Sequence, residues 1–146
     1  MIRFLLSPLM VLLLMAGSGA AHAELVVVVN PKSGVDKLSR DEVTNIFLGR
    51  FRQLPGGMAA QPIDLPTAQG EKASFYRLLV NKELAEINAY WARLVFSGRT
   101  SPPRLGGGNE DVLRYVAATP GGIGYLDRSK TDSRVRIVLE LNERAD

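Results

Sequence analysis

The stretch from Gly106 to Asp127 constrains the fold more than any other part of the chain. It contains a glycine run, an amphipathic helical pattern and a short apolar strand, with Pro120 and two glycines between the helix and the strand. Asn109 is a good helix N-cap, and the two acidic residues after it suit the positive end of a helix dipole. A helix that leads through a tight glycine turn into a buried strand is typical of layered folds, so we predict an α/β fold.

A second apolar run, Leu25–Val29, favours the same fold class. Its sequence LVVVV has no polar position, which is typical of a strand buried on both faces in a parallel sheet that helices cover. We expect it to lie beside Ile123–Leu126 at the centre of a mostly parallel sheet with helices on both faces. Residues 24–146 are predicted to form a single domain.

Residues 1–23 have the pattern of a secretory signal peptide. Arg3 gives a positive start, the apolar stretch Phe4–Ala16 follows, and Ala21-His22-Ala23 is a small-residue cleavage site. The apolar stretch is too short for a comfortable membrane span, and no basic cluster follows it. We therefore expect cleavage after Ala23, a periplasmic location, and no membrane-embedded part in the mature chain that begins at Glu24.

The composition excludes several kinds of site. The chain has no cysteine, and its one histidine, His22, lies in the predicted signal peptide. The mature chain can therefore have no disulfide, thiol nucleophile or His/Cys zinc site, and we expect no metal or cofactor. The 18 basic and 15 acidic residues are scattered, which argues against a nucleic-acid partner. We find no pair of carboxylates at a convincing catalytic spacing, so we do not expect an enzyme.

Local signals place the elements of the first half of the mature chain. Ser39 and Glu42 form a capping-box pattern at the start of a helix, and Gly49 is the expected end of that helix. Gln61–Leu65 has the pattern of a short strand. Pro62 favours a position at the start of this strand or at a sheet edge.

In the second half, the pattern predicts helices over Gly70–Val80 and Lys82–Phe96, with Asn81 as the N-cap of the second helix. Thr100–Gly108 is rich in proline and glycine and is predicted to be a loop. Arg134–Leu141 alternates between polar and apolar side chains, which predicts a half-exposed strand. The apolar face of this strand contains Val135, Ile137, Leu139 and Leu141.

Four segments of the chain stand in an order found in a known family. They are Val29-Asn30-Pro31 before Leu38-Ser39, Ile46–Arg50 (IFLGR), Gln69–Leu79 (QGEKASFYRLL) and Pro120–Leu126 (PGGIGYL). In this order they resemble the phosphate-type substrate-binding proteins of ABC transporters. The resemblance implies one lobe of the type II periplasmic-binding-protein fold, a role in solute binding and transport, and a small oxyanion such as phosphate as ligand. Because the family is two-lobed and longer, it also implies a ligand cleft that is absent or half-built.

The resemblance places the ligand site at the loop that opens the helix Gly70–Val80. The family has an Arg, an Asp and then Ser-Gly-Thr there, and these side chains hold the anion together with free helix amides. This chain has Leu65 for the Arg, Thr67 for the Asp, Gln69 for the Ser and Glu71 for the Thr, and it keeps only the glycine. A cation is lost and a carboxylate is gained, so we expect weak or altered anion binding. Replacing Leu65 by Arg together with Glu71 by Thr should then restore it.

The candidate ligand-binding residues are Thr67, Gln69, Gly70, Glu71 and Lys72. Lys72 could compensate for the lost arginine, although a solvated helix residue is its more common role. Arg50 and Arg52 flank a loop and could meet an anion. The glycine run Gly106–Gly108 could let a ligand approach the backbone, although such runs are more often connectors.

Two functions fit these features. One is a periplasmic solute-binding-like protein with a degenerate anion site. The other is an interaction module without a ligand that docks on a transporter, a sensor or another envelope protein partner. The segment Thr67–Lys72 discriminates between them. A concave site with free amides favours ligand binding, whereas a Glu71 side chain that fills this space as a cap favours the interaction module.

Overall fold

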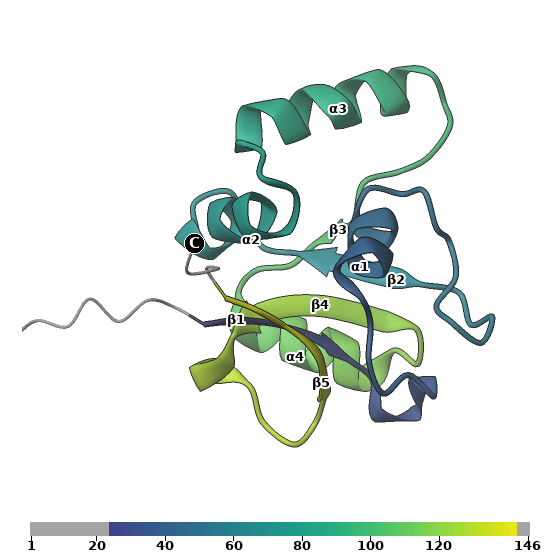
Figure 1. Cartoon of the computed structure of the whole chain (residues 1–146), viewed down its shortest axis with the longest axis vertical. Coiled ribbons are helices and arrows are strands. Elements are labelled where there is room, and N and C mark those ends of the chain that lie inside the picture. Colours follow the sequence, from purple (N-terminus) through teal and green to yellow (C-terminus); the bar gives the residue numbers. More distant parts are fainter. Residues whose placement is uncertain (1–23, 143–146) are drawn as a thin grey trace, which may run out of the picture.

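The computed structural model describes residues 24–142, which form a five-stranded sheet with four α-helices (Figure 1). The signal peptide predicted for residues 1–23 lies outside the described residues. The strands are β1 (Leu25–Val29), β2 (Gln61–Asp64), β3 (Arg104–Leu105), β4 (Gly122–Asp127) and β5 (Arg136–Leu141). The helices are α1 (Arg40–Phe47), α2 (Gly70–Val80), α3 (Leu84–Phe96) and α4 (Asn109–Ala118), and Pro31–Ser33 and Arg128–Lys130 form short 3-10 turns.

The order of strands in the sheet is β3-β2-β4-β1-β5. The α/β class is confirmed, and β1 and β4 are neighbours as predicted. The sheet is mixed, however, and the prediction of a mostly parallel sheet was wrong. β2 runs parallel to β3 and β4, whereas β1 runs antiparallel to β4 and β5. The apolar sequence of β1 correctly predicts its burial, since all five residues are fully buried. A strand that is buried on both faces can run in either direction, however, so this sequence does not determine whether its neighbours are parallel or antiparallel.

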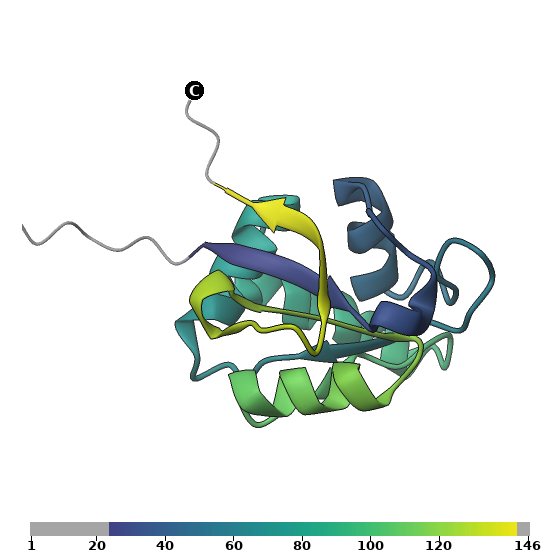
Figure 2. The same cartoon turned by 90° about the horizontal axis from the view of Figure 1, so that it is seen from below.

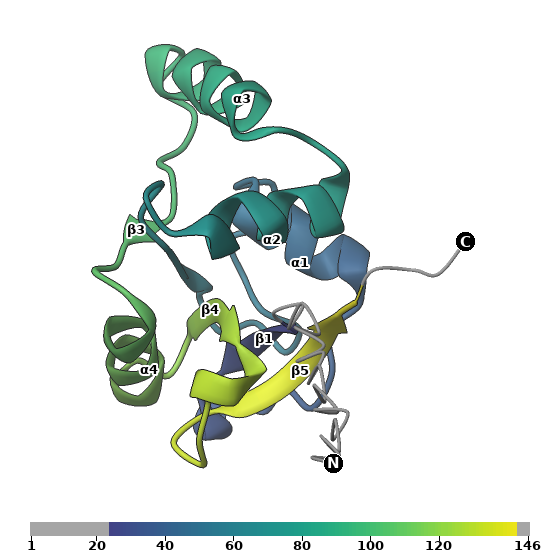
Figure 3. The ribbon, with the colours of Figure 1, turned by 90° about the vertical axis from the view of Figure 1, so that its left-hand side faces the viewer.

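Helices cover both faces of the sheet, as predicted. α4 lies on one face, α1 and α2 lie on the other, and α3 is the outermost helix, beyond α2 (Figures 1, 2 and 3). Aromatic side chains fill the layer between α1, α2 and the sheet. The ring of Phe75 stacks on Tyr125 with centroids 3.7 Å apart, and Phe47 packs edge-on against Phe75.

The start and end of α1 follow the predicted local chemistry. The Ser39 hydroxyl accepts the Glu42 N–H at 3.0 Å, and the Glu42 carboxylate accepts the Ser39 N–H at 2.9 Å, which completes the capping box. Gly49 follows the helix with φ +73°, in the left-handed region. Its α-carbon also lies against Trp91, since a Cβ added there would come within 2.9 Å of the indole ring.

Two asparagines have roles other than the predicted N-caps. Asn81 ends α2 in the left-handed conformation with φ +55°, and its N–H donates to Arg77 O, while α3 begins only after Glu83. Asparagine tolerates this conformation, which competes with its use as an N-cap. In α4 the cap position is Gly108, and Asn109 is the first helical residue.

Two strand features also differ from the prediction. Part of the predicted loop Thr100–Gly108 forms β3, a short strand beside β2, and two residues are too few to show an alternating pattern. β5 contains a bulge opposite Val27 and Val28, which inserts Val138 into the core and leaves Ile137 and Leu139 half-buried. The carbonyl of Val138 accepts the N–H of Leu38.

Candidate functional site

A buried carboxylate, Asp64, lies at the end of β2, directly before the predicted ligand loop. Only 5% of this residue is exposed. The hydroxyl of Tyr76 donates to the carboxylate at 2.6 Å, the hydroxyl of Tyr125 donates to its other oxygen, and the N–H of Leu65 donates to it at 2.9 Å. Three donors thus satisfy a charge that would otherwise be costly to bury.

The two tyrosines remain hydrogen-bond donors at neutral pH. Burial raises the pKa of Tyr76 well above its usual value, and the negative charge of Asp64 and its hydrogen bond raise it further. The pKa of Tyr125 is raised by the same causes in the same order. Deprotonation would place a second negative charge beside Asp64 in the core. The Asp64 cluster, which we define as Asp64, Tyr76, Tyr125 and Lys72, is therefore a fixed network.

Lys72 belongs to this cluster and is not a solvated helix residue. Its ammonium nitrogen lies 3.8 Å from the Asp64 carboxylate, and only 13% of its side chain is exposed. The sequence-based interpretation was wrong because the ion-pair partner lies eight positions earlier, in β2 rather than in the helix. Because Lys72 is paired with Asp64, the carboxylate partly neutralises its positive charge, and Lys72 attracts an external anion less strongly.

The candidate loop itself is a tight turn into α2. The N–H of Gln69 donates to Pro66 O at 2.9 Å, and the N–H of Lys72 donates to Gln69 O at 3.1 Å. In the described part of the chain, the N-cap residue Gln69 makes no side-chain hydrogen bond to the start of α2. The N–H groups of Gly70 and Glu71 have no intrahelical acceptor, as at any α-helix start, so they are available to a ligand.

The start of α4 approaches the start of α2. Gly106 N–H donates to the backbone oxygen of Asp64 at 2.8 Å, which ties the glycine run to the end of β2. A Cβ added at Gly108 would lie 3.8 Å from the Gln69 side-chain oxygen. That oxygen and the side-chain oxygen of Asn109 are both buried and have no hydrogen-bond partner within residues 24–142. The start of α4 and the Gln69 side chain at the start of α2 therefore lie close together.

The five candidate residues share the loop and the first turn of α2. Thr67 and Gly70 are exposed, whereas Gln69, Glu71 and Lys72 are partly buried. Leu65, which stands where the family has an arginine, is fully buried in the core. Sequence reasoning did not select Asp64. Its available signal was an acidic residue inside a strand pattern, a class of residue that strands usually avoid.

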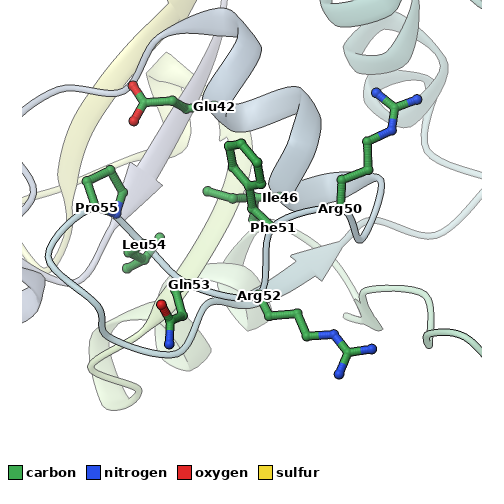
Figure 4. A pocket seen from close by; sticks show the side chains of 8 residues that line it. All are labelled: Glu42, Ile46, Arg50, Phe51, Arg52, Gln53, Leu54 and Pro55. Carbon is green, nitrogen blue, oxygen red and sulfur yellow. The ribbon is translucent and has the colours of Figure 1, made fainter.

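Arg50 and Arg52 lie at a separate hollow. This hollow has a volume of about 600 Å³ and is lined by Glu42, Ile46 and residues 50–55 (Figure 4). Its lining includes no residue of Thr67–Lys72. Arg52 donates to Arg99 O at 2.8 Å, and Arg50 contacts the Asn45 side chain at 3.4 Å.

Within residues 24–142, no group of three or more His, Cys, Asp or Glu side chains is placed to hold a metal ion. No helix in the same range is long and apolar enough to cross a membrane.

Models of protein families give no match to this chain, and neither do curated proteins. Solved structures do match. The ABC-type phosphate transport receptor from Vibrio cholerae is similar with a TM-score of 0.63 at 15% identity, over 79% of this chain and 45% of that one. A second match is a Clostridium perfringens protein, named as a putative phosphate ABC transporter substrate-binding protein and solved with bound phosphate. Its TM-score is 0.62 at 15% identity, over 79% of this chain and 44% of that one. PstS from Borrelia burgdorferi matches with a TM-score of 0.60 at 16% identity, over 79% of this chain and 46% of that one.

These similarities establish the fold that the sequence resemblance implied. The chain spans less than half the length of the solved structures it matches.

Proposed function

We propose that this chain is a periplasmic solute-binding-like protein whose anion site, at the start of α2, is degenerate and holds phosphate weakly. One observation carries the proposal. The first turn of α2 has open amides, but it contains Glu71, and the nearby cation Lys72 is bound to Asp64. The fold shared with proteins named for phosphate supports the class of ligand. The proposal includes export with cleavage after Ala23 and assigns no catalytic activity.

The energetics favour weak binding. Helix amides and the positive dipole end attract an anion. The missing arginine removes charge-assisted hydrogen bonds worth about 1.5–3 kcal/mol each. Glu71 adds repulsion on the order of 1 kcal/mol at a partly screened site. Together these terms weaken binding by about two to three decades, at about 1.4 kcal/mol per decade.

The test removes the charge of Glu71 and keeps its shape. Glu71→Gln should tighten phosphate binding by about fivefold, because repulsion on the order of 1 kcal/mol is lost while the open amides remain. Glu83→Gln is the matched control, since it removes the same charge from the exposed start of α3. Isothermal titration with phosphate at low ionic strength, where screening is weakest, measures both variants.

The combined Leu65→Arg and Glu71→Thr change is a poorer test than the sequence suggested. Leu65 is fully buried, so an arginine there would disturb the core beside Asp64. Equal phosphate affinity in the wild type, Glu71→Gln and Glu83→Gln would count against the proposed role of Glu71.

The second function, an interaction module, is favoured by apolar side chains on the surface. Phe96 is 96% exposed and its chain neighbour Val95 is 52% exposed, and exposed apolar patches mark interaction surfaces. If Glu71→Gln gains no affinity for phosphate or other oxyanions, the interaction module becomes the better proposal. The two functions are thus separated by the same titration.

A further inference from the structure

The outermost helix, α3, has two different faces. Ile87 and Trp91 are buried on its inner side. On the opposite side, a row of small and apolar residues with helical spacing is exposed to solvent. We define the α3 outer face as Ala85, Ala89, Ala92 and Phe96. Phe96 is almost fully exposed at 96%, and its neighbour Val95 is 52% exposed. Figures 1 and 3 show α3 at the rim of the molecule.

We propose that the α3 outer face is a homodimer interface, in which α3 of a second copy packs antiparallel across it. This inference is independent of the anion site. It rests on the shape of the face and on the charges that flank it.

The shape of the face suits an antiparallel partner. With the two-fold axis between Ala89 and Ala92, Phe96 lies opposite Ala85 of the second copy, and Ala89 lies opposite Ala92 of that copy. Each large ring then fills the space above a small residue, as close packing requires. A parallel pair would instead place Phe96 against Phe96 and leave the alanines apart.

The charges on one flank are complementary in the same arrangement. Glu86 and Arg93 are seven residues apart, so they lie on the same flank of the α3 outer face. The antiparallel pair brings Glu86 opposite Arg93 of the second copy, and the two-fold axis repeats this ion pair. In a parallel pair, this flank would face Asn88 and Val95, which carry no charge.

Both groups are available for such pairing. Among residues 24–142 of one copy, the only ion pair of Glu86 is with the exposed Lys82, at 3.3 Å, and pairs of this kind are weak. Among residues 24–142, Arg93 makes no ion pair. Because one helix per copy gives a small interface, we expect a reversible dimer with a dissociation constant in the micromolar range.

Sedimentation velocity over a concentration series of the purified protein tests the interface. Phe96→Ser should abolish most of the dimer, and this side chain is too exposed to be needed for folding. Glu86→Arg and Arg93→Glu should each weaken dimerisation about tenfold or more, because each places like charges across the axis. The combined Glu86→Arg and Arg93→Glu variant should return toward the wild-type affinity.

Lys82→Ala is the control, because it removes the partner of Glu86 within one copy and should leave the dimer intact. Circular dichroism establishes that each variant is folded. A wild-type protein that remains monomeric at millimolar concentration would overturn the proposal. The proposal would also be overturned if Phe96→Ser left the dimer affinity unchanged, or if the combined charge variant did not restore it. In either case another surface would hold the copies together.

Discussion

Asp64 shows how single residues hold the candidate site in place. Its side chain receives hydroxyl donors from α2 and β4, and its backbone oxygen receives the N–H of Gly106. One residue therefore ties together the end of β2, the first turns of α2 and the glycine run before α4. Removing one partner of a buried charge is costly, because the charge is left without compensation.

The raised pKa values of the two tyrosines predict a loss of stability in alkali. An unfolded tyrosine loses its proton near pH 10, whereas the folded groups of Tyr76 and Tyr125 keep theirs. The unfolded state therefore binds fewer protons above that pH, and the free energy of unfolding should fall by about 1.4 kcal/mol per pH unit for each tyrosine. Below pH 10 this contribution is fully present.

Urea denaturation from about pH 9 to about pH 11, on either side of the ordinary tyrosine pKa of roughly 10, measures the slope. Tyr76→Phe should make the slope shallower. Tyr115→Phe is the control, because its hydroxyl contacts Gln61 at the surface rather than Asp64. A slope that Tyr76→Phe does not change would contradict the assignment of the proton linkage to the Asp64 cluster.

At the scale of elements, packing between α4 and the sheet depends on Gly124. A Cβ at this position would lie 2.7 Å from a methyl carbon of Val112 and 2.9 Å from a methyl carbon of Ile63. Gly124→Ala should therefore destabilise the protein by about 1–3 kcal/mol through overpacking. Gly70→Ala, where no atom lies within 4 Å, is the control and should change stability by less than about 1 kcal/mol. If chemical denaturation showed the same loss of unfolding free energy for Gly124→Ala and Gly70→Ala, this account of the packing would be contradicted.

The elements that sequence predicts well are those fixed by neighbouring residues. The capping box of Ser39 and Glu42 and the apolar run of β1 carry their own signals. The direction of β1, the bulge at Val138 and the short β3 depend on strands far away in the sequence. The same limit applies to the candidate site, because the sequence predicted a ligand loop at Thr67–Lys72 but could not show that Lys72 and two tyrosines converge on Asp64.

At the scale of the whole molecule, Glu24, which follows the predicted cleavage site, contacts the rest of the fold. Its carboxylate pairs with Arg128 at 2.9 Å, and its carbonyl accepts the Arg128 N–H at 2.7 Å. Cleavage after Ala23 would preserve both contacts. Mass spectrometry of the protein from its native host should find Glu24 at the N-terminus, and a chain that retains Met1 would contradict export with cleavage.

In the function that we propose, the start of α2 holds an anion and the Glu71 carboxylate in its first turn opposes that anion. Isothermal titration of the wild-type protein with phosphate tests this balance most directly. The expected result is weak binding, with a dissociation constant in the millimolar range or above. Micromolar or tighter binding by the wild type would contradict a degenerate site, since it would require a cation other than Lys72, which is paired with Asp64.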